Sequence, residues 1–263
     1  TRRGFVGLAA AAGAMSATRL SWARQMTATA APGAAGALGD VFPTTDPELA
    51  MQMVGASHGN VAKVRELLAV DRGLALATWD WGFGDWETAL GAASHVGSRE
   101  IAELLIEHGA RPDLFTLAML GRVDAVRAVC EAMPGIQKVR GPHGITLMRH
   151  AQAGKAADVQ AYLESLGGAD EGEKDIGLNE AEAAVFSGMY DASGVRFEVR
   201  PSRMGGLEFL REGGSARRLG RVAEHRFSPA GAPQVEIVFV VEGDRARELV
   251  VTRGVELLRA ARV

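Results

Sequence analysis

Two side chains that could perform chemistry, a serine hydroxyl and a histidine, lie in one short stretch. The segment "GASHG" (Gly55–Gly59) fits Gly-x-Ser-x-Gly, the pattern of a nucleophilic serine on a sharp strand-to-helix turn. Such a turn would expose Ser57 for attack. Met51–Val54, directly before the motif, has helical character instead of strand character. The sequence therefore predicts no nucleophile at Ser57.

Metal ligation is the second chemistry that the histidines could perform. His143 and His150 bracket the segment "GITLMR", but they are split between a predicted turn and a predicted helix, with no carboxylate beside them. His58 and His95 flank glycines between predicted helices, where a capping role is the simpler interpretation. Cys130 is the only cysteine, which excludes an intrachain disulfide and a thiolate cluster. The sequence predicts no catalytic residue, no metal and no cofactor.

Aromatic and acidic residues are concentrated in the stretch "ATWDWGFGDWETAL" (Ala77–Leu90). Acids among aromatic rings are also found in sugar subsites, but the sequence places no second general acid. Tryptophan is a common anchor of protein interfaces, so the stretch predicts a partner-binding loop with aromatic anchors and orienting acids. Its predicted site residues are Trp79, Asp80, Trp81, Phe83, Asp85, Trp86 and Glu87. The alternative, that the tryptophans fold back as a packed corner, stays open.

Four segments in the middle of the chain share one pattern of small residues, a glycine and then an apolar helix. These segments are Val54–Ala69, Gly91–Ala110, Leu117–Ala132 and Met148–Ser165. The second, with the flanks "TALGAASHVGSREIAELLIEHGARPD", resembles the ankyrin-repeat consensus. The resemblance implies a solenoid of about four helix pairs whose concave face and finger hairpins bind a protein partner. The stretch Ala77–Leu90 lies where a finger is expected.

Helix boundaries can be predicted from local residues. Asp46 followed by Pro47 is typical of a helix start, and Asp113 is a second N-cap. Gly109 is expected to end a helix in the left-handed conformation. Because the third copy follows the second so closely, we expect it to lack a finger hairpin.

Alternation replaces helical spacing after residue 185. Val195, Phe197 and Val199 alternate with charged residues, and "QVEIVFVVEGDRARELVVTRG" predicts two strands that turn at Gly243-Asp244. About seven short strands are expected, in an antiparallel meander or partial barrel. The fold class is therefore α+β.

The segments "SGMYDASGVRFEV" and "GGLEF" and the final hairpin resemble the lipocalin-like domain that trails penicillin-binding-protein-type serine hydrolases. Their catalytic Ser-x-x-Lys does not occur here, so the hydrolase activity does not transfer. A small ligand in the barrel cavity is the alternative function. An open cup would favour it, and tight burial of the aromatic side chains would oppose it. These side chains are Phe197, Phe209, Phe227 and Phe239.

The first residues, "TRRGFVGLAAAAGAMSATRL", are similar to a twin-arginine export signal, with Arg2, Arg3 and Phe5 as its motif. The apolar run is too short for a stable membrane span. The expected organisation is a signal peptide (1–30), a flexible linker (31–44), an ankyrin domain (45–170), a second linker (171–184) and a lipocalin-like β domain (185–263).

The net charge of −3 does not indicate the excess of positive charge that is typical of a nucleic-acid-binding protein. Together these features predict an exported, non-enzymatic protein of the periplasm or cell envelope that binds an unknown protein partner. A hydrolase is the remaining alternative. The oligomeric state does not follow from the sequence.

Overall fold

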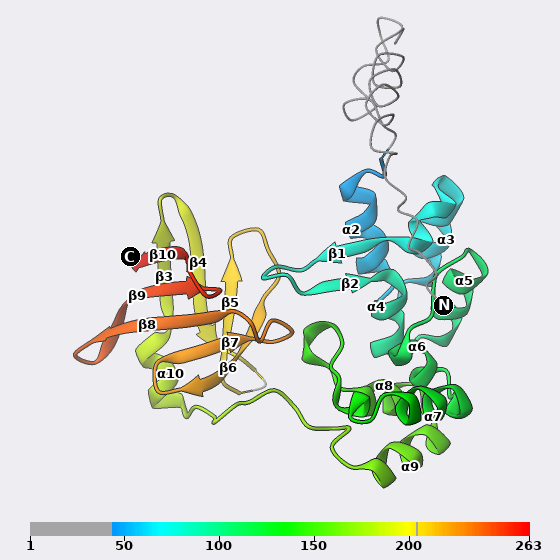
Figure 1. Ribbon diagram of the computed structural model, residues 1–263. Coiled ribbons are helices and arrows are strands. Elements are labelled where there is room, and N and C mark those ends of the chain that lie inside the picture. Colours follow the sequence, from blue (N-terminus) through cyan, green and yellow to red (C-terminus); the bar gives the residue numbers. More distant parts are fainter. Residues whose placement is uncertain (1–43, 204) are drawn as a thin grey trace, which may run out of the picture. The chain divides into compact units, whose positions relative to one another are not determined.

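The computed structural model describes residues 44–203 and 205–263, and Thr45–Val263 form one compact unit. It is a mixed α+β fold in which α-helices precede a β-barrel (Figure 1). The predicted signal motif at Arg2, Arg3 and Phe5 lies outside the described residues, so it stays a prediction. No described helix has both the length and the apolar character that a bilayer crossing requires.

Eight helices form four consecutive pairs. The pairs are α2 (Pro47–Ala56) with α3 (Val61–Val70), α4 (Ala89–His95) with α5 (Arg99–Glu107), α6 (Leu114–Met119) with α7 (Val123–Ala132), and α8 (Leu147–Ala153) with α9 (Ala157–Leu166). The first helices of the pairs touch one another in the order α2, α4, α6, α8. This stacking brings the ends of successive first helices to one side of the helical part.

The helices begin and end where local residues predict. Asp46 accepts a hydrogen bond from Glu48 N with Pro47 at the start of α2, and Asp113 caps α6. Gly109 follows α5 with a φ of 98°, a conformation that glycine adopts without strain. These three predictions are confirmed.

The links between the pairs differ. After η1 (Arg72–Leu76), a hairpin of β1 (Thr78–Asp80) and β2 (Trp86–Thr88) precedes α4. No strand lies between α5 and α6, as expected for the third copy. The link from α7 to α8 holds η2 (Ile136–Lys138) and η3 (Pro142–Gly144).

Small residues allow the helices to approach closely. Ala92 and Ala93 are fully buried in α4. A Cβ at Gly154, directly after α8, would lie 1.9 Å from the carbonyl oxygen of Met119 at the end of α6. Because no real Cβ tolerates that distance, a glycine is required at this contact.

Helix α10 (Glu180–Phe186) begins inside the segment expected to be a linker, and a closed antiparallel barrel of eight strands follows it. The strands are β3 (Gly188–Ala192), β4 (Val195–Pro201), β5 (Leu207–Arg211), β6 (Arg217–Ala223), β7 (Arg226–Pro229), β8 (Glu236–Glu242), β9 (Arg245–Thr252) and β10 (Glu256–Arg262). The expected meander or partial barrel of about seven strands is corrected to a closed barrel of eight, because β10 pairs with β3 through Ala261↔Asp191 and Arg262↔Tyr190. Sequence alternation identifies strands but does not reveal this pairing of the first strand with the last.

Aromatic side chains fill the barrel. Phe227 and Phe239 are almost fully buried with ring centroids 5.4 Å apart, and Phe186 from α10 lies 5.0 Å from each of them. Tyr190 is fully buried and donates a hydrogen bond to the carbonyl oxygen of Phe186. This packing opposes a ligand in the interior of the barrel.

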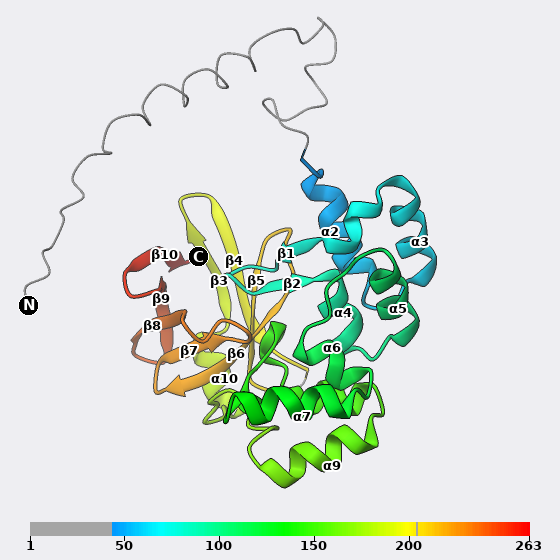
Figure 2. The ribbon, with the colours of Figure 1, turned by 45° about the vertical axis from the view of Figure 1, so that its right-hand side comes forward.

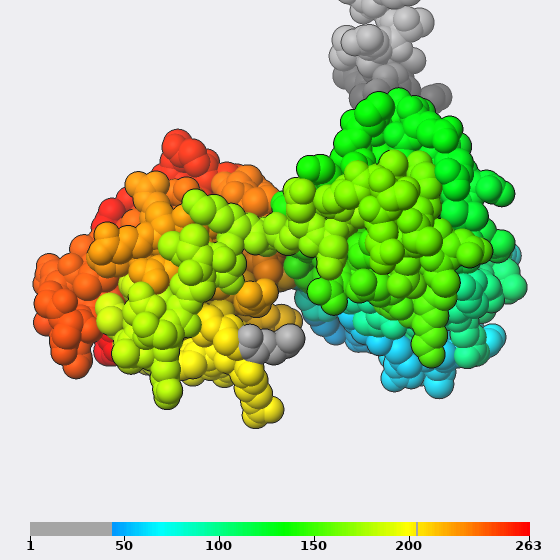
Figure 3. Space-filling view, turned by 90° about the horizontal axis from the view of Figure 1, so that it is seen from below, coloured from blue at the N-terminus to red at the C-terminus, as the bar shows by residue number. Residues whose placement is uncertain are grey.

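Two segments connect the helices with the barrel. Hairpin β1–β2 extends from the helices to the barrel (Figure 2), where the ring of Phe83 lies 5.5 Å from that of Phe209. The segment from α9 to α10, yellow-green in Figure 3, runs along the surface between the two parts. In this segment the carbonyl oxygens of Glu171 and Gly172 accept hydrogen bonds from Arg140.

Candidate metal centre

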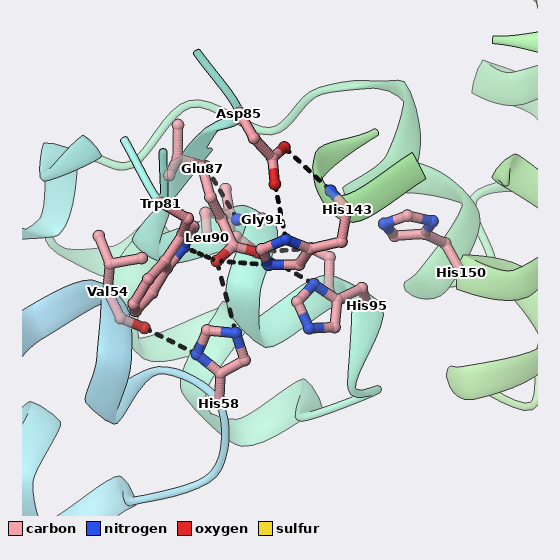
Figure 4. A network of polar contacts seen from close by, with 12 residues as sticks. Val54, His58, Trp81, Asp85, Glu87, Leu90, Gly91, His95, His143 and His150 are labelled. Atoms are coloured by element: carbon pink, nitrogen blue, oxygen red, sulfur yellow. Dashed lines mark hydrogen bonds and ion pairs between the residues drawn. The ribbon is translucent and has the colours of Figure 1, made fainter. Parts of the chain in front are cut away.

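Four side chains that are distant in sequence meet beside hairpin β1–β2 (Figure 4). They are His58, Glu87, His95 and His143, and we call them the His–Glu cluster. One donor atom from each lies within 4.8 Å of the other three. Among the described residues, this is the group with the composition and spacing of a metal site.

Different elements position the four side chains. His58 lies in the turn between α2 and α3, and His95 is the last residue of α4. Glu87 lies in β2, and Thr88 directly after it caps α4, so strand and helix form one continuous segment. His143 lies in η3 with a φ of 60°. The stacking of the first helices then brings the histidines to the same side.

The carboxylate of Glu87 is the centre of the cluster and is fully buried. Its Oε2 lies 3.4 Å from Nε2 of His58 and 3.4 Å from Nε2 of His143. Its Oε1 lies 3.0 Å from Nδ1 of His95. The indole Nε1 of Trp81 donates a hydrogen bond of 2.7 Å to Oε2, which fixes the orientation of the carboxylate.

Outer contacts determine which ring nitrogen two of the histidines present to the cluster. Nδ1 of His58 lies 3.1 Å from the carbonyl oxygen of Val54, which can only accept, so this nitrogen carries the proton. Nδ1 of His143 lies 2.8 Å from Oδ2 of Asp85 and 2.8 Å from Nη1 of Arg217, and Nε2 of the same ring faces Glu87. For His58 this arrangement directs the Nε2 lone pair inward when the imidazole is neutral, and a carboxylate beside Nδ1 of His143 resembles the carboxylate–histidine–metal arrangement of known sites.

Two buried atoms of the cluster lack a hydrogen-bond partner. Although Oε1 of Glu87 and Nδ1 of His95 are 3.0 Å apart, neither makes a hydrogen bond within the described part of the chain. An unsatisfied buried polar atom costs about 1–3 kcal/mol. A shared ion between these two atoms would satisfy both.

Charge interactions stabilise the cluster in the metal-free state. Burial opposes ionisation of Glu87, but the interactions of its carboxylate with the imidazoles of His143 and His95 outweigh burial and lower the pKa of Glu87 to about 2. Burial also opposes protonation of His143, but the carboxylates of Asp85 and Glu87 outweigh it and raise the pKa of His143 to about 9. Arg217 supplies a second positive charge beside Asp85. The negative charges of Asp85 and Glu87 are thus balanced by the positive charges of His143 and Arg217.

The barrel contributes the outer support of the cluster. Arg217 on β6 is buried, and it donates hydrogen bonds to Oδ2 of Asp85 and, at 2.7 Å, to the carbonyl oxygen of Trp81. A Cβ at Gly231, which follows β7, would lie 2.6 Å from Oδ1 of Asp85 and 2.7 Å from the backbone nitrogen of His143. Arg217 therefore holds Asp85, Gly231 leaves room for its carboxylate, and Asp85 in turn accepts a hydrogen bond from the backbone nitrogen of His143.

The donor distances suit a small transition-metal ion. Two ligands bound at about 2.05 Å to a tetrahedral ion lie about 3.3 Å apart. The contacts between Glu87 and the three histidines are 3.0–3.4 Å. Imidazole and carboxylate donors suit zinc and other first-row metals, whereas Ca²⁺ and Mg²⁺ prefer all-oxygen sites. The four donor atoms lie within 4.8 Å of one another, so the side chains would have to move closer together to bind one such ion.

The predicted aromatic anchors have different environments in the hairpin. Trp79 and Trp81 pack against the helical core, and Phe83 packs against the barrel core. These contacts correspond to the packed-corner alternative. Trp86 is 62% exposed and remains available to a partner. The prediction of partner binding is not tested by these positions and stays a prediction.

The predicted orienting acids are engaged within the chain. Oδ1 of Asp80 accepts hydrogen bonds from the backbone nitrogens of Gly82 and Gly84 and stabilises the hairpin turn. Asp85 and Glu87 are buried in the network around the cluster. In this conformation neither buried carboxylate can reach an external protein.

The other candidates from the sequence have structural environments. Oγ of Ser57 is buried and donates to the carbonyl oxygen of Met53 in a turn between helices, so it is not presented as a nucleophile. Cys130 is buried in the helical core. His150 is buried outside the cluster. The sequence interpretation of His58 and His95 is a capping role; their recurrence at the ends of the first helices of two successive helix pairs is the signal that could have grouped them.

No protein-family model matches the chain, and no curated protein is significantly similar to it. The His–Glu cluster is a candidate metal site in a protein with a helical part and a closed barrel. The geometry of the cluster is therefore the basis for a functional assignment.

Proposed function

We propose that this protein binds one divalent transition-metal ion, with Zn²⁺ as the best fit, through His58, Glu87, His95 and His143. The observation that carries the proposal is the convergence of three imidazole nitrogens on one fully buried carboxylate. The unpartnered Oε1 of Glu87 and Nδ1 of His95 support it. An ionic network of Glu87 with protonated imidazoles is the competing interpretation, and the content of bound metal distinguishes the two.

A structural role for the ion agrees best with this donor set. Four protein donors complete a tetrahedral shell, whereas catalytic zinc sites keep a position for water or substrate. The ion would join a turn between helices, a strand, a helix end and a loop. These considerations support the prediction that the protein is not an enzyme, and they replace the expectation that it holds no metal.

The test is metal content after incubation with Zn²⁺ and removal of the free ion. We expect one zinc per chain, and we expect Co²⁺ in its place to give the intense visible absorption of a tetrahedral site. His58→Gln and His143→Gln should each lose the tightly bound ion. His225→Gln, a partly exposed histidine of the barrel, is the matched control and should retain it. Equal zinc content in all four proteins would refute the proposal.

The ankyrin resemblance, the export signal and the lipocalin-like resemblance of the barrel also belong to this proposal. Four stacked helix pairs, a hairpin at the finger position and a short third link support an ankyrin-type array. A closed barrel of eight strands is consistent with a lipocalin-like domain.

We propose a periplasmic location, tested by fractionation of cells that carry the Arg2→Lys, Arg3→Lys double variant of the export motif. Unchanged export would contradict the signal assignment.

Protein-partner binding is a second candidate function, favoured by the exposure of Trp86 at 62%. An exposed tryptophan on a supported hairpin is a typical interface anchor. Cross-linking in the native cell envelope should capture a partner that Trp86→Ala loses and Leu76→Ala, a control on another exposed apolar side chain, retains. Capture of the same partner by all three proteins would place the interface elsewhere.

A further inference from the structure

An open cleft of about 680 Å³ lies between hairpin β1–β2 and the rim of the barrel. Its volume falls within the range of about 300–1,000 Å³ that small-molecule sites occupy. Phe197, Phe209 and Val251 line the cleft and also belong to the core of the barrel, so the cleft borders that core on the side of the hairpin. A ligand here would contact both parts of the chain.

Aromatic rings from both parts line the cleft. Trp79, Trp81 and Phe83 come from the hairpin, and Phe197 and Phe209 come from β4 and β5. The rings of Phe197 and Phe209 are stacked with centroids 5.1 Å apart, and Phe83 lies 5.5 Å from Phe209. Phe197 and Phe209 are buried, so the half-buried rings of Trp79, Trp81 and Phe83 supply most of the apolar surface for the body of a ligand.

The polar side of the cleft carries excess positive charge. Arg211, Arg217 and Arg253 line it, and Asp80 is its one acidic lining residue. The charge of Arg217 is balanced by buried Asp85. Arg253 donates to a neutral acceptor, the carbonyl oxygen of Phe83, at 2.8 Å.

Arg211 is the free cation of the cleft. It is exposed, and within residues 44–203 and 205–263 it makes no side-chain hydrogen bond or ion pair. It pairs in register with Phe197, so a guanidinium lies next to the aromatic surface. A guanidinium presents parallel N–H donors that match a carboxylate or sulfonate.

We propose that this cleft binds a small amphipathic organic anion, with its apolar body on the aromatic rings and its acidic group on Arg211. The charge complementarity selects an anion over a neutral or cationic molecule of the same shape. The inference does not rest on the proposed metal, because no residue of the His–Glu cluster lines the cleft. It also differs from a ligand inside the barrel, since the occupant lies at the rim and contacts the hairpin.

The test uses the fluorescent aromatic sulfonate 8-anilino-1-naphthalenesulfonate and the folded, metal-free full chain. We expect saturable binding that decanoate displaces and decyltrimethylammonium does not. Arg211→Met keeps the length of the side chain without its charge and should weaken binding about tenfold, as expected for one charge-assisted contact. Arg247→Met, on an exposed arginine of β9 outside the cleft, should bind like the parent.

A second pair of variants separates charge from folding. Leu257 lines the cleft and is 54% exposed, so its substitution should leave the fold intact. Leu257→Glu should weaken binding of the sulfonate more than Leu257→Gln, because only the former adds a negative charge. Equal binding by the parent, Arg211→Met and Leu257→Glu would overturn the proposal. Equal displacement by the cationic and anionic detergents, or no saturable binding, would also overturn it.

Discussion

Raising the pH should destabilise the metal-free protein because folding traps a proton on His143. In the folded state the carboxylates of Asp85 and Glu87 raise its pKa to about 9, against an ordinary value of 6.5. The other charged or titratable groups around this ring are Arg217 and the cluster histidines His58 and His95. The stabilisation is complete below pH 6.5, where folded and unfolded chains are both protonated. Between pH 6.5 and 9 only the folded chain retains the proton, so the stabilisation is lost as pH rises.

The size of the effect follows from the difference in pKa. At roughly 1.4 kcal/mol for each pKa unit, His143 contributes about 3 kcal/mol at pH 6.5 and almost none above pH 9. Urea unfolding of the chelator-treated protein at pH 6.5 and 9.5, followed by circular dichroism, measures this loss. His143→Gln cannot titrate and is the reference that cancels the contributions of other groups. Saturating Zn²⁺ should abolish the decline, because the ion replaces the proton.

Two results would refute the reasoning about His143. The first is a decline of equal size in the parent and in His143→Gln, which would assign the pH dependence to other residues. The second is a parent stability that is constant or rises between pH 6.5 and 9.5 relative to the variant. Either result would mean that the ring does not hold a proton between the two carboxylates.

Further predictions concern the outer support, the close helix contact and the ion. Arg217→Met should destabilise the fold by about 3–5 kcal/mol in urea unfolding, because it leaves Asp85 buried without its arginine. The same variant should weaken Zn²⁺ binding about 10–100-fold in competition with a chelator, and unchanged affinity would exclude a supporting role. Gly154→Ala should destabilise by roughly 1–3 kcal/mol through its clash with Met119, whereas Gly55→Ala, in an open helical position of α2, should stabilise by about 0.5–1 kcal/mol. The two alanine variants having the same unfolding free energy would contradict the clash. Free Zn²⁺ at 100 times its dissociation constant should stabilise the parent by about 2.7 kcal/mol. A gain in the parent that is no larger than the gain in His58→Gln would contradict the site.

Local signals made the helical part predictable. Asp46, Asp113 and Gly109 determine helix ends through contacts with residues a few positions away. Barrel closure depends instead on pairing of Ala261 with Asp191, two residues at opposite ends of the domain. Alternation cannot encode which strands meet, so the sequence indicated the strands and left the closure undetermined.

The candidate site was predictable only in part for a related reason. Glu87 could be singled out because it lies in an unusual aromatic stretch, although the sequence suggested an external partner for it. His58, His95 and His143 are spread over three separate links, and nothing local relates them. Only the stacking of the helix pairs converts their positions into distances of a few ångströms. Comparison of equivalent positions in successive helix pairs would have placed His58 and His95 together.

The alternation of side chains along the hairpin has a consequence for its permitted length. Thr78, Trp79 and Asp80 pair with Thr88, Glu87 and Trp86 respectively, and buried Asp85 and Glu87 flank exposed Trp86. Successive residues of a strand face opposite sides, so a slip of one residue would turn both carboxylates outward and the indole inward. An insertion of a single residue after Asp85 would therefore turn the side chain of Glu87 away from the His–Glu cluster. The hairpin should therefore tolerate side-chain substitutions far better than insertions or deletions of residues.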